Sequence, residues 1–166
     1  MLFTNTKDAI QQEMRTNVIY RIPCNDCGAS YVGLTTTYLK TRVGAHRSDQ
    51  TKMKNLTDAI SHGNPLAANE MERLKEKTAL MYHSITQQHQ FGLENAMVID
   101  QHRRKNALAA LEVCHIINTD HTVNKRSDTD GLSSMYAGIL HTLKNRTVNR
   151  NAITRTQPST VVPNTR

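Results

Sequence analysis

The pattern of hydrophobic and polar residues predicts a β-hairpin near the start of the chain. Two β-rich runs, 17–23 and 30–34, are separated by a short turn segment, and each run carries a tyrosine, Tyr20 or Tyr31. β-branched and aromatic residues favour extended backbone, and a short connection between two such runs is typical of antiparallel strands. We therefore expect a hairpin that presents both tyrosines.

Helical patterns follow the hairpin. The threonines at 35–37 are N-cap candidates for a helix that ends near Ser48, and helix formers predict a second helix over 70–83. The stretch 91–99 is expected to contain a third strand, and 103–117 a further helix. These elements predict an α+β fold, in which a short antiparallel sheet of about three strands is flanked by helices.

The remaining pattern concerns helix breaks and the end of the chain. Gly63-Asn64-Pro65 is typical of a break between two helices. A last helix is predicted over 132–143. Over 144–166 the sequence turns to Asn, Thr, Arg and Pro, with few residues able to fill a core, so we expect a polar, disordered tail.

Composition and charge narrow the class of partner. The chain has 166 residues, of which 37% are hydrophobic, and it contains no apolar run near the length that crosses a bilayer. Lys and Arg number 21 against 14 Asp and Glu, which gives a formal charge of +7. This charge favours a polyanion, and nucleic acid fits it better than an acidic small molecule. The opening residues lack the pattern of a secretory signal, so we expect an intracellular, reducing compartment.

The three cysteines leave two interpretations open. Cys24 and Cys27 form a C-x-x-C pair in the predicted turn, and Cys114 lies alone in an apolar helical stretch, where we expect it to be part of the core. In a reducing compartment the pair is either half of a metal site or a reduced pair in a turn, rather than a disulfide. The residues alone do not choose between these.

Two triplets, Val18-Ile19-Tyr20 and Tyr31-Val32-Gly33, enclose this cysteine pair. Their arrangement resembles the signature of the GIY-YIG endonuclease domain. The position of Cys24 and Cys27 between the triplets resembles the version of the domain carried by Penelope-like retrotransposons.

Later segments carry the same resemblance. Arg42 and His46 are four residues apart on the predicted helix, the segment 111–116 resembles the surroundings of the family's metal-binding glutamate, and 124–130 resembles the run that closes the domain. The resemblance covers residues 15–143, which we expect to form one small domain of this type. The segment 52–77 is an unusual filler for the family, and we interpret it as a surface insertion.

The resemblance implies hydrolysis of a phosphodiester bond. Glu112 is implied to bind one Mg²⁺ or Mn²⁺, because a carboxylate suits a hard cation that keeps most of its waters. Arg42 is implied to make a forked contact to the phosphate. Five residues are expected to be catalytic: Tyr20, Tyr31, Arg42, His46 and Asn124.

The roles of these residues differ. Tyr20 is implied to activate or position the attacking water, with Tyr31 beside it. A phenol has a pKa near 10, so a base role needs nearby cations to lower that value, and His46 is the competing candidate for the base. Asn124 is expected to complete the site by orienting a ligand or a backbone segment.

The resemblance also points to histidines as further zinc ligands. His83 and His89 match best, with Cys24 and Cys27 supplying the other half of the site. Such a zinc would fasten the hairpin to the second helix and stabilise the fold rather than perform the cleavage.

The resulting prediction is a metal-dependent endonuclease that nicks DNA. In the retrotransposon setting the nick frees a 3′ hydroxyl, a reverse transcriptase of the same element is the implied protein partner, and the expected location is the nucleus. No membrane partner and no small-molecule cofactor are expected. The alternatives are a catalytically inactive, zinc-stabilised nucleic-acid-binding module and a zinc-stabilised protein interaction domain. Seven basic residues are the expected contacts to nucleic acid: Lys40, Arg47, Arg103, Arg104, Lys105, Lys125 and Arg126.

Overall fold

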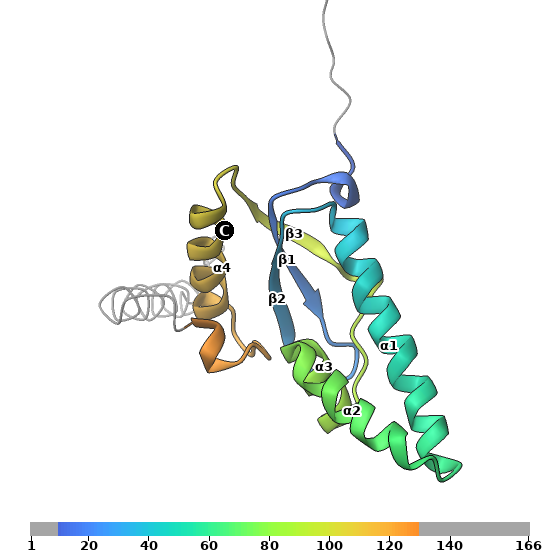
Figure 1. Cartoon of the computed structure of the whole chain (residues 1–166). Helices are drawn as coiled ribbons and strands as arrows, with labels where there is room; N and C mark the ends of the chain where they lie inside the picture. The colour runs from blue at the N-terminus through green and yellow to red at the C-terminus, as the bar shows by residue number, and fades with distance from the viewer. Residues whose placement is uncertain (1–9, 130–166) are drawn as a thin grey trace, which may run out of the picture.

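A three-stranded antiparallel sheet forms the middle of the protein, whose computed structural model describes residues 10–129 (Figure 1). The central strand is β1 (Val18–Pro23), with β2 (Ser30–Thr35) on one side and β3 (Met97–Gln101) on the other. The predicted hairpin is formed by β1 and β2. The prediction of a small α+β domain with about three strands is therefore confirmed.

The strand register decides which side chains meet. In the hairpin Tyr20 lies opposite Gly33, and Ile22 lies opposite Tyr31. Pairing between β1 and β3 is interrupted by a bulge between Ile19 and Tyr20. Because successive side chains of a strand point to opposite faces, Tyr20 and Ile22 share one face of the sheet, and Ile19 lies on the other.

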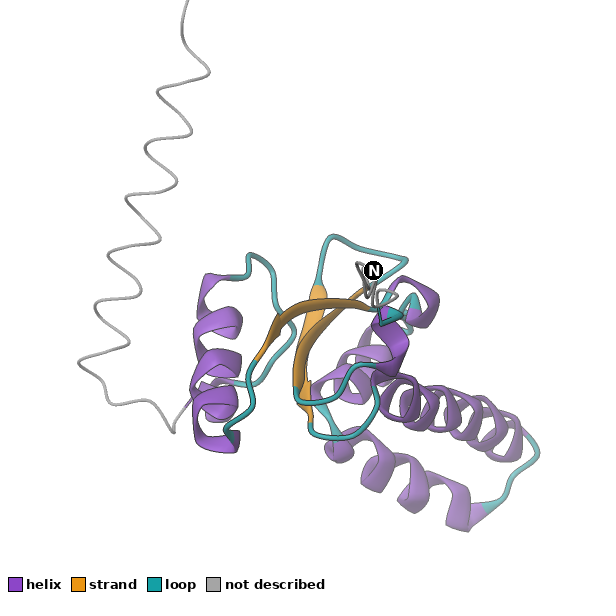
Figure 2. Cartoon of the chain, turned by 90° about the horizontal axis from the view of Figure 1, so that it is seen from above, coloured by secondary structure: helices purple, strands orange, loops and turns teal. Residues whose placement is uncertain are grey.

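Four helices flank the sheet, and Figure 2 shows them on its two sides. One face is covered by α1 (Leu39–Ser61), α2 (Pro65–Lys77) and α3 (Ala79–Gln87), whereas α4 (Lys105–Asn118) covers the opposite face. Three short 3-10 turns complete the described elements: Gln12–Met14, Leu93–Asn95 and Arg126–Thr129.

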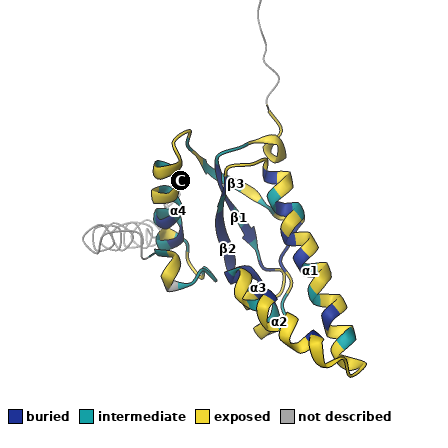
Figure 3. Ribbon diagram, viewed as in Figure 1, coloured by how far each residue is buried: buried dark blue, intermediate teal, exposed yellow. Residues whose placement is uncertain are grey.

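Each face of the sheet has its own hydrophobic core. Figure 3 shows the buried residues concentrated on β1, β2 and the helix sides that face the sheet. On the larger face, Tyr20 and Ile22 pack with leucines of α1, α2 and α3. On the smaller face, Ile19 and Val32 pack against Leu108 of α4. Burial of both faces is what holds α4 and the other three helices to one sheet.

The first helix is longer than its pattern predicts. The predicted end near Ser48 is wrong, because α1 continues to Ser61. The extension is polar apart from residues such as Leu56, which is buried against the following helix, so packing rather than periodicity sustains it. At the start, the predicted threonine caps are also wrong: the residue before α1 is Tyr38, and it makes no side-chain cap.

The break at residues 63–65 is confirmed. Gly63 has a positive φ of 80°, Asn64 accepts a hydrogen bond from the Leu66 backbone N–H at 3.0 Å, and Pro65 starts α2. Glycine tolerates the left-handed backbone, and proline fits the first turn of a helix. The single helix predicted over 70–83 is wrong, because Thr78 has extended backbone and divides it into α2 and α3.

Other boundaries differ by less. The third strand begins inside the predicted stretch 91–99, at Met97, and continues beyond it to Gln101, while Phe91 forms an isolated bridge to Cys24. Cys114 is half-buried rather than part of the core. The predicted helix over 132–143 and the tail over 144–166 lie outside the described residues.

The segment 52–77 contributes to the main core. It forms the end of α1 and all of α2, and it buries Leu56, Ala67 and Leu74. That the segment is an insertion stays a prediction. Among residues 10–129, no helix combines the length and apolar character needed to cross a membrane.

Truncation of Leu108 is expected to destabilise the protein by about 2–5 kcal/mol, because it removes a leucine that is 1% exposed and leaves a cavity between α4 and the sheet. Urea denaturation of Leu108→Ala measures this loss. Leu66→Ala is the matched control: Leu66 is also helical but 70% exposed, and its change should stay within about 0.5 kcal/mol. Equal effects of the two changes would contradict the assigned role of α4 in the core.

Candidate functional site

A chain of hydrogen bonds joins the central strand to α1. The Tyr20 hydroxyl lies 2.9 Å from Nε2 of His46 and accepts a hydrogen bond from Nε of Arg42 at 3.0 Å. Arg42 and His46 are four residues apart, so the helix places both on the side that faces the sheet. Tyr20 and His46 are almost completely buried. Three residues that the sequence singled out are thus brought into direct contact.

Tyr31 completes an aromatic group around this junction. Its ring centroid lies 6.2 Å from that of Tyr20 and 5.5 Å from that of His46. Gly33 makes this packing possible: a Cβ there would lie 2.8 Å from the Tyr20 hydroxyl oxygen and 2.9 Å from a ring carbon of Tyr31. Position 33 therefore requires glycine, because the rings of Tyr20 and Tyr31 fill the space that a side chain at this position would need.

Burial sets the protonation of the two tyrosines and the histidine. It raises the pKa of Tyr20 far above the usual range of a phenol, and the neighbouring Tyr31 raises it further, while Arg42 acts in the opposite direction. Burial, followed by the charge of Arg42, lowers the pKa of His46 to about 4. Both groups are therefore neutral near pH 7.

The direction of one of these hydrogen bonds is fixed by chemistry. A guanidinium can only donate, so the Tyr20 oxygen accepts from Arg42. Between Tyr20 and His46 the donor depends on which ring nitrogen carries the imidazole proton: with the proton on Nδ1, Nε2 accepts from the Tyr20 hydroxyl. Nδ1 is buried and has no hydrogen-bond partner within the described part of the chain.

Glu112 reaches the same region from the opposite face of the sheet. It lies on α4 and is half-buried. Burial raises its pKa, a hydrogen bond from the Leu34 backbone lowers it, the charge of Asp128 raises it and that of Arg42 lowers it. The carboxylate also acts on the pKa of Tyr31. Glu112 is therefore an electrostatic neighbour of both Tyr31 and Arg42, beside the β2 strand.

Asn124 holds the outer edge of β2. Its side-chain oxygen accepts a hydrogen bond from the Val32 backbone N–H at 2.9 Å, and its amide group donates to the Val32 carbonyl at 2.8 Å. Two residues earlier in each of the two segments, Ser30 forms a parallel bridge with Thr122. Asn124 thus replaces a neighbouring strand at this edge and orients the backbone between Tyr31 and Gly33.

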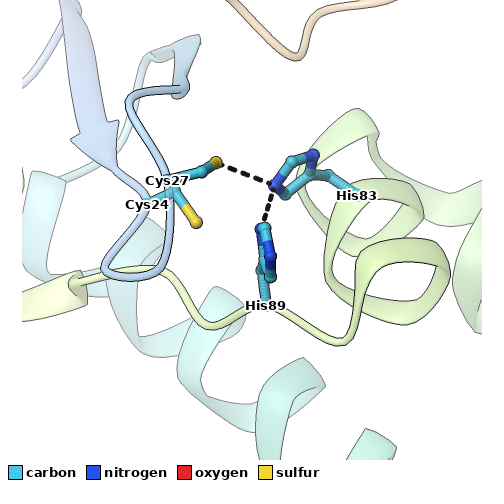
Figure 4. Close-up of side chains that lie close together, drawn as sticks. All are labelled: Cys24, Cys27, His83 and His89. Carbon is cyan, nitrogen blue, oxygen red and sulfur yellow. Dashed lines mark hydrogen bonds between the residues drawn. The ribbon is translucent and has the colours of Figure 1, made fainter.

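A second cluster gathers at the hairpin turn (Figure 4). Cys24, Cys27, His83 and His89 each offer one ligand atom, and these atoms all lie within 4.8 Å of one another. The Cys27 sulfur lies 3.6 Å from Nε2 of His83, which lies 3.1 Å from Nδ1 of His89. These four residues are close enough to hold a metal ion.

Two hydrogen bonds join the backbone segments around this cluster. The Asn25 N–H donates to the Gln90 carbonyl at 2.8 Å, and the Gln90 N–H donates to the Asp26 carboxylate at 2.6 Å. Burial, and then the charge of His89, lower the pKa of His83, so the neutral imidazole that a metal requires is favoured. The hydrogen bonds therefore hold the hairpin turn against the segment after α3, next to the four side chains.

The seven predicted nucleic-acid contacts lie on different elements of the described part of the chain. Lys40 and Arg47 are exposed on α1 and line a hollow between that helix and the first 3-10 turn. A separate hollow at the start of α4 is lined by Arg103 and Arg104. The remaining three residues lie elsewhere: exposed Lys105 at the first position of α4, half-buried Lys125, and Arg126 in the last 3-10 turn.

Lys125 interacts with residues of α2 and α3. Its ammonium lies 2.6 Å from the Glu76 carboxylate and 5.1 Å from the centroid of the Tyr82 ring. These contacts tie the segment after α4 to α2 and α3. A phosphate would have to compete with Glu76 for this lysine.

The sequence interpretation missed one charged pair at the site. Asp49 and Lys77 form an ion pair of 2.6 Å between α1 and the end of α2, and both act on the pKa of His46. Asp49 follows the predicted helix end at Ser48. The signal that could have revealed it is its i+3 spacing from His46, provided that the helix had been extended.

Replacement of Gly33 by alanine is expected to destabilise the protein by about 1–3 kcal/mol, because the added methyl group meets the packed rings of Tyr20 and Tyr31. Gly44→Ala is the matched control, since a Cβ at this helical position meets nothing within 4 Å and alanine favours a helix by about 1 kcal/mol. Thermal or urea denaturation distinguishes the two. Stabilisation by both changes would contradict the close approach at Gly33.

No family model, no curated protein and no solved structure matches the chain. Any inference about its function therefore rests on the sequence of the chain and on the arrangement of its residues.

Proposed function

We propose that this protein is a metal-dependent endonuclease that hydrolyses a phosphodiester bond of DNA. The observation that carries the proposal is the buried hydrogen-bonded chain from Arg42 through Tyr20 to His46, with Tyr31 and Glu112 beside it. Phosphodiester hydrolysis needs a base for water, a cation at the phosphate and a metal site, and this group supplies a candidate for each. The resemblance of the two triplets to the GIY-YIG signature supports the same reaction.

The protons can be followed from residue to residue. Tyr20 gives its phenol proton to Nε2 of His46, which becomes an imidazolium, and the Tyr20 phenolate takes a proton from the attacking water. The resulting hydroxide forms a bond to phosphorus, and the bond from phosphorus to the 3′ oxygen breaks. That oxygen takes a proton from solvent and leaves as a free 3′ hydroxyl.

Arg42 has two tasks in this scheme. Its guanidinium already donates to the Tyr20 oxygen, so it offsets part of the cost of forming a buried phenolate. Its guanidinium, which also interacts with Tyr31, is a planar fork of N–H groups that matches phosphate oxygens. Arg42 would therefore link the base to the scissile phosphate.

Glu112 fits the role of ligand for Mg²⁺ or Mn²⁺. It is a half-buried carboxylate near Arg42 and Tyr31, and its raised pKa shows that it lacks full compensation for its charge. A bound divalent cation would supply positive charge for the phosphate oxygens. Asp128 is the nearby carboxylate whose negative charge would assist binding.

We also propose that the Cys24, Cys27, His83 and His89 cluster holds a structural Zn²⁺. Ordinary zinc–ligand bond lengths and tetrahedral angles place sulfur and nitrogen ligands about 3.6 Å apart and two nitrogens about 3.3 Å apart. The corresponding distances here are 3.6 Å and 3.1 Å. With all four positions taken by protein, zinc would stabilise the fold rather than bind substrate.

The charge of +7 supports nucleic acid as the partner, and the resemblance supports DNA in the nucleus. In the retrotransposon setting the freed 3′ hydroxyl would prime a reverse transcriptase of the same element. The inactive, zinc-stabilised binding module is the second candidate, and it is favoured by one observation: burial raises the pKa of the Tyr20 phenol and so opposes formation of the phenolate.

Zinc removal is expected to lower the thermal unfolding temperature, because a ligand that binds only the folded state at about 1,000 times its Kd adds about 4 kcal/mol of stability. Cys27→Ala and His83→Ala should reduce zinc content and the unfolding temperature together. Metal analysis and thermal denaturation measure the two quantities. Cys114→Ala is the control that keeps full zinc. Unchanged unfolding after complete chelation would contradict the structural role.

Nicking of supercoiled plasmid tests the reaction itself. Tyr20→Phe and Glu112→Gln should each reduce Mg²⁺-dependent nicking by about 100-fold or more, because they remove the proton relay and the metal ligand. Tyr38→Phe and Glu72→Gln change the same residue types at exposed positions, directly before α1 and on α2, and should leave nicking unchanged. EDTA should abolish it. A folded, zinc-loaded protein that binds DNA without nicking it would establish the inactive module instead.

A further inference from the structure

An ion pair acts on His46 from the following turn of α1, where Asp49 pairs with Lys77 of α2. Asp49 is 7% exposed, and its Oδ1 lies 2.6 Å from the ammonium group of Lys77, the last residue of α2. The i+3 spacing places Asp49 and His46 on one face of α1. A carboxylate is therefore held beside the imidazole by a lysine from another helix.

The two ring nitrogens of His46 have different surroundings. Nε2 lies within hydrogen-bond distance of the Tyr20 hydroxyl, whereas Nδ1 is buried and has no hydrogen-bond partner among residues 10–129. An unpaired buried polar atom costs free energy, so its persistence at a candidate site calls for a physical reason. Charged and titratable groups face the ring from four elements, β1, β2, α1 and α2: Tyr20, Tyr31, Arg42, Asp49 and Lys77.

We propose that Asp49 is a positioning residue that stabilises His46 as an imidazolium, and that Lys77 holds and moderates Asp49. This role rests on the proposed nuclease function, in which His46 takes the Tyr20 proton. The step begins with a neutral phenol and a neutral imidazole and ends with a phenolate and an imidazolium that carries protons on both nitrogens.

The charges around His46 act in opposite directions. An imidazolium at His46 would form in a buried position beside the guanidinium of Arg42, and both burial and Arg42 disfavour it. Asp49 acts in the opposite direction, and Lys77 acts with Arg42. Asp49 thus opposes the two effects that hinder proton transfer, and Lys77 limits how far it does so.

A titration of the His46 ring by NMR tests this arrangement without any nuclease assay. Lys77→Gln should raise the pKa of His46, and Asp49→Asn should lower it. Lys52→Gln is the matched control, because Lys52 and Glu70 form another ion pair between α1 and α2, at 3.0 Å and exposed to solvent. It should leave His46 unchanged. If Asp49→Asn fails to fold, the variant of the exposed Lys77 still tests the proposal. An unchanged or lowered pKa of His46 in Lys77→Gln would overturn it.

Turnover at saturating DNA gives a second readout. Asp49→Asn should lower the nicking rate by about 10-fold with little change in KM, whereas Lys77→Gln should not lower it. A merely structural ion pair predicts that both variants, which break the same pair, lose activity alike, and this result would also overturn the proposal. If the wild-type protein does not nick DNA, the proposed nuclease function is wrong. The opposite changes in the pKa of His46 in the two variants would still test how Asp49 and Lys77 act on the imidazole.

Discussion

The burial of the Tyr20 hydroxyl is the constraint on which much of the structure depends. A phenol in the centre of a core needs hydrogen-bond partners, and Arg42 and His46 supply them from one face of α1. These bonds hold α1 against the sheet at a defined register. They also require Gly33 opposite Tyr20, because the ring fills the space of any larger side chain. Packing and candidate chemistry are thus one arrangement.

The hairpin connects this junction to the cluster of Cys24, Cys27, His83 and His89. Tyr20 and Tyr31 lie in its strands, and Cys24 and Cys27 lie in its turn. A zinc bound there would fasten the turn to α3 and to the segment after it, which in turn leads into β3. Because both clusters share the same short strands, loss of one would be felt at the other through the backbone rather than through any direct contact.

Local sequence explains a large part of the fold. The β-rich runs 17–23 and 30–34 differ from β1 and β2 by one residue each, the residue types at 63–65 predicted the break between helices, and the helix over 103–117 differs from α4 by only a residue or two at its ends. The errors share a cause. α1 runs past Ser48 because Leu56 packs on α2, and the helix over 70–83 is divided at Thr78, whose extended backbone and side-chain cap start a new helix. The periodic pattern of hydrophobic residues reveals neither the packing of Leu56 nor the cap formed by Thr78.

The sequence by itself determined which residue types were present for chemistry and which of them are neighbours along an element, such as Arg42 and His46 four residues apart. Only the tertiary structure decided which of them meet: His83 and His89 beside the cysteine pair, Glu112 beside Tyr31, and Lys77 on Asp49. The physical reason is that short-range spacing is set by the geometry of one helix or strand. Contacts between elements, and the burial that shifts the pKa of His46, arise only when those elements pack together.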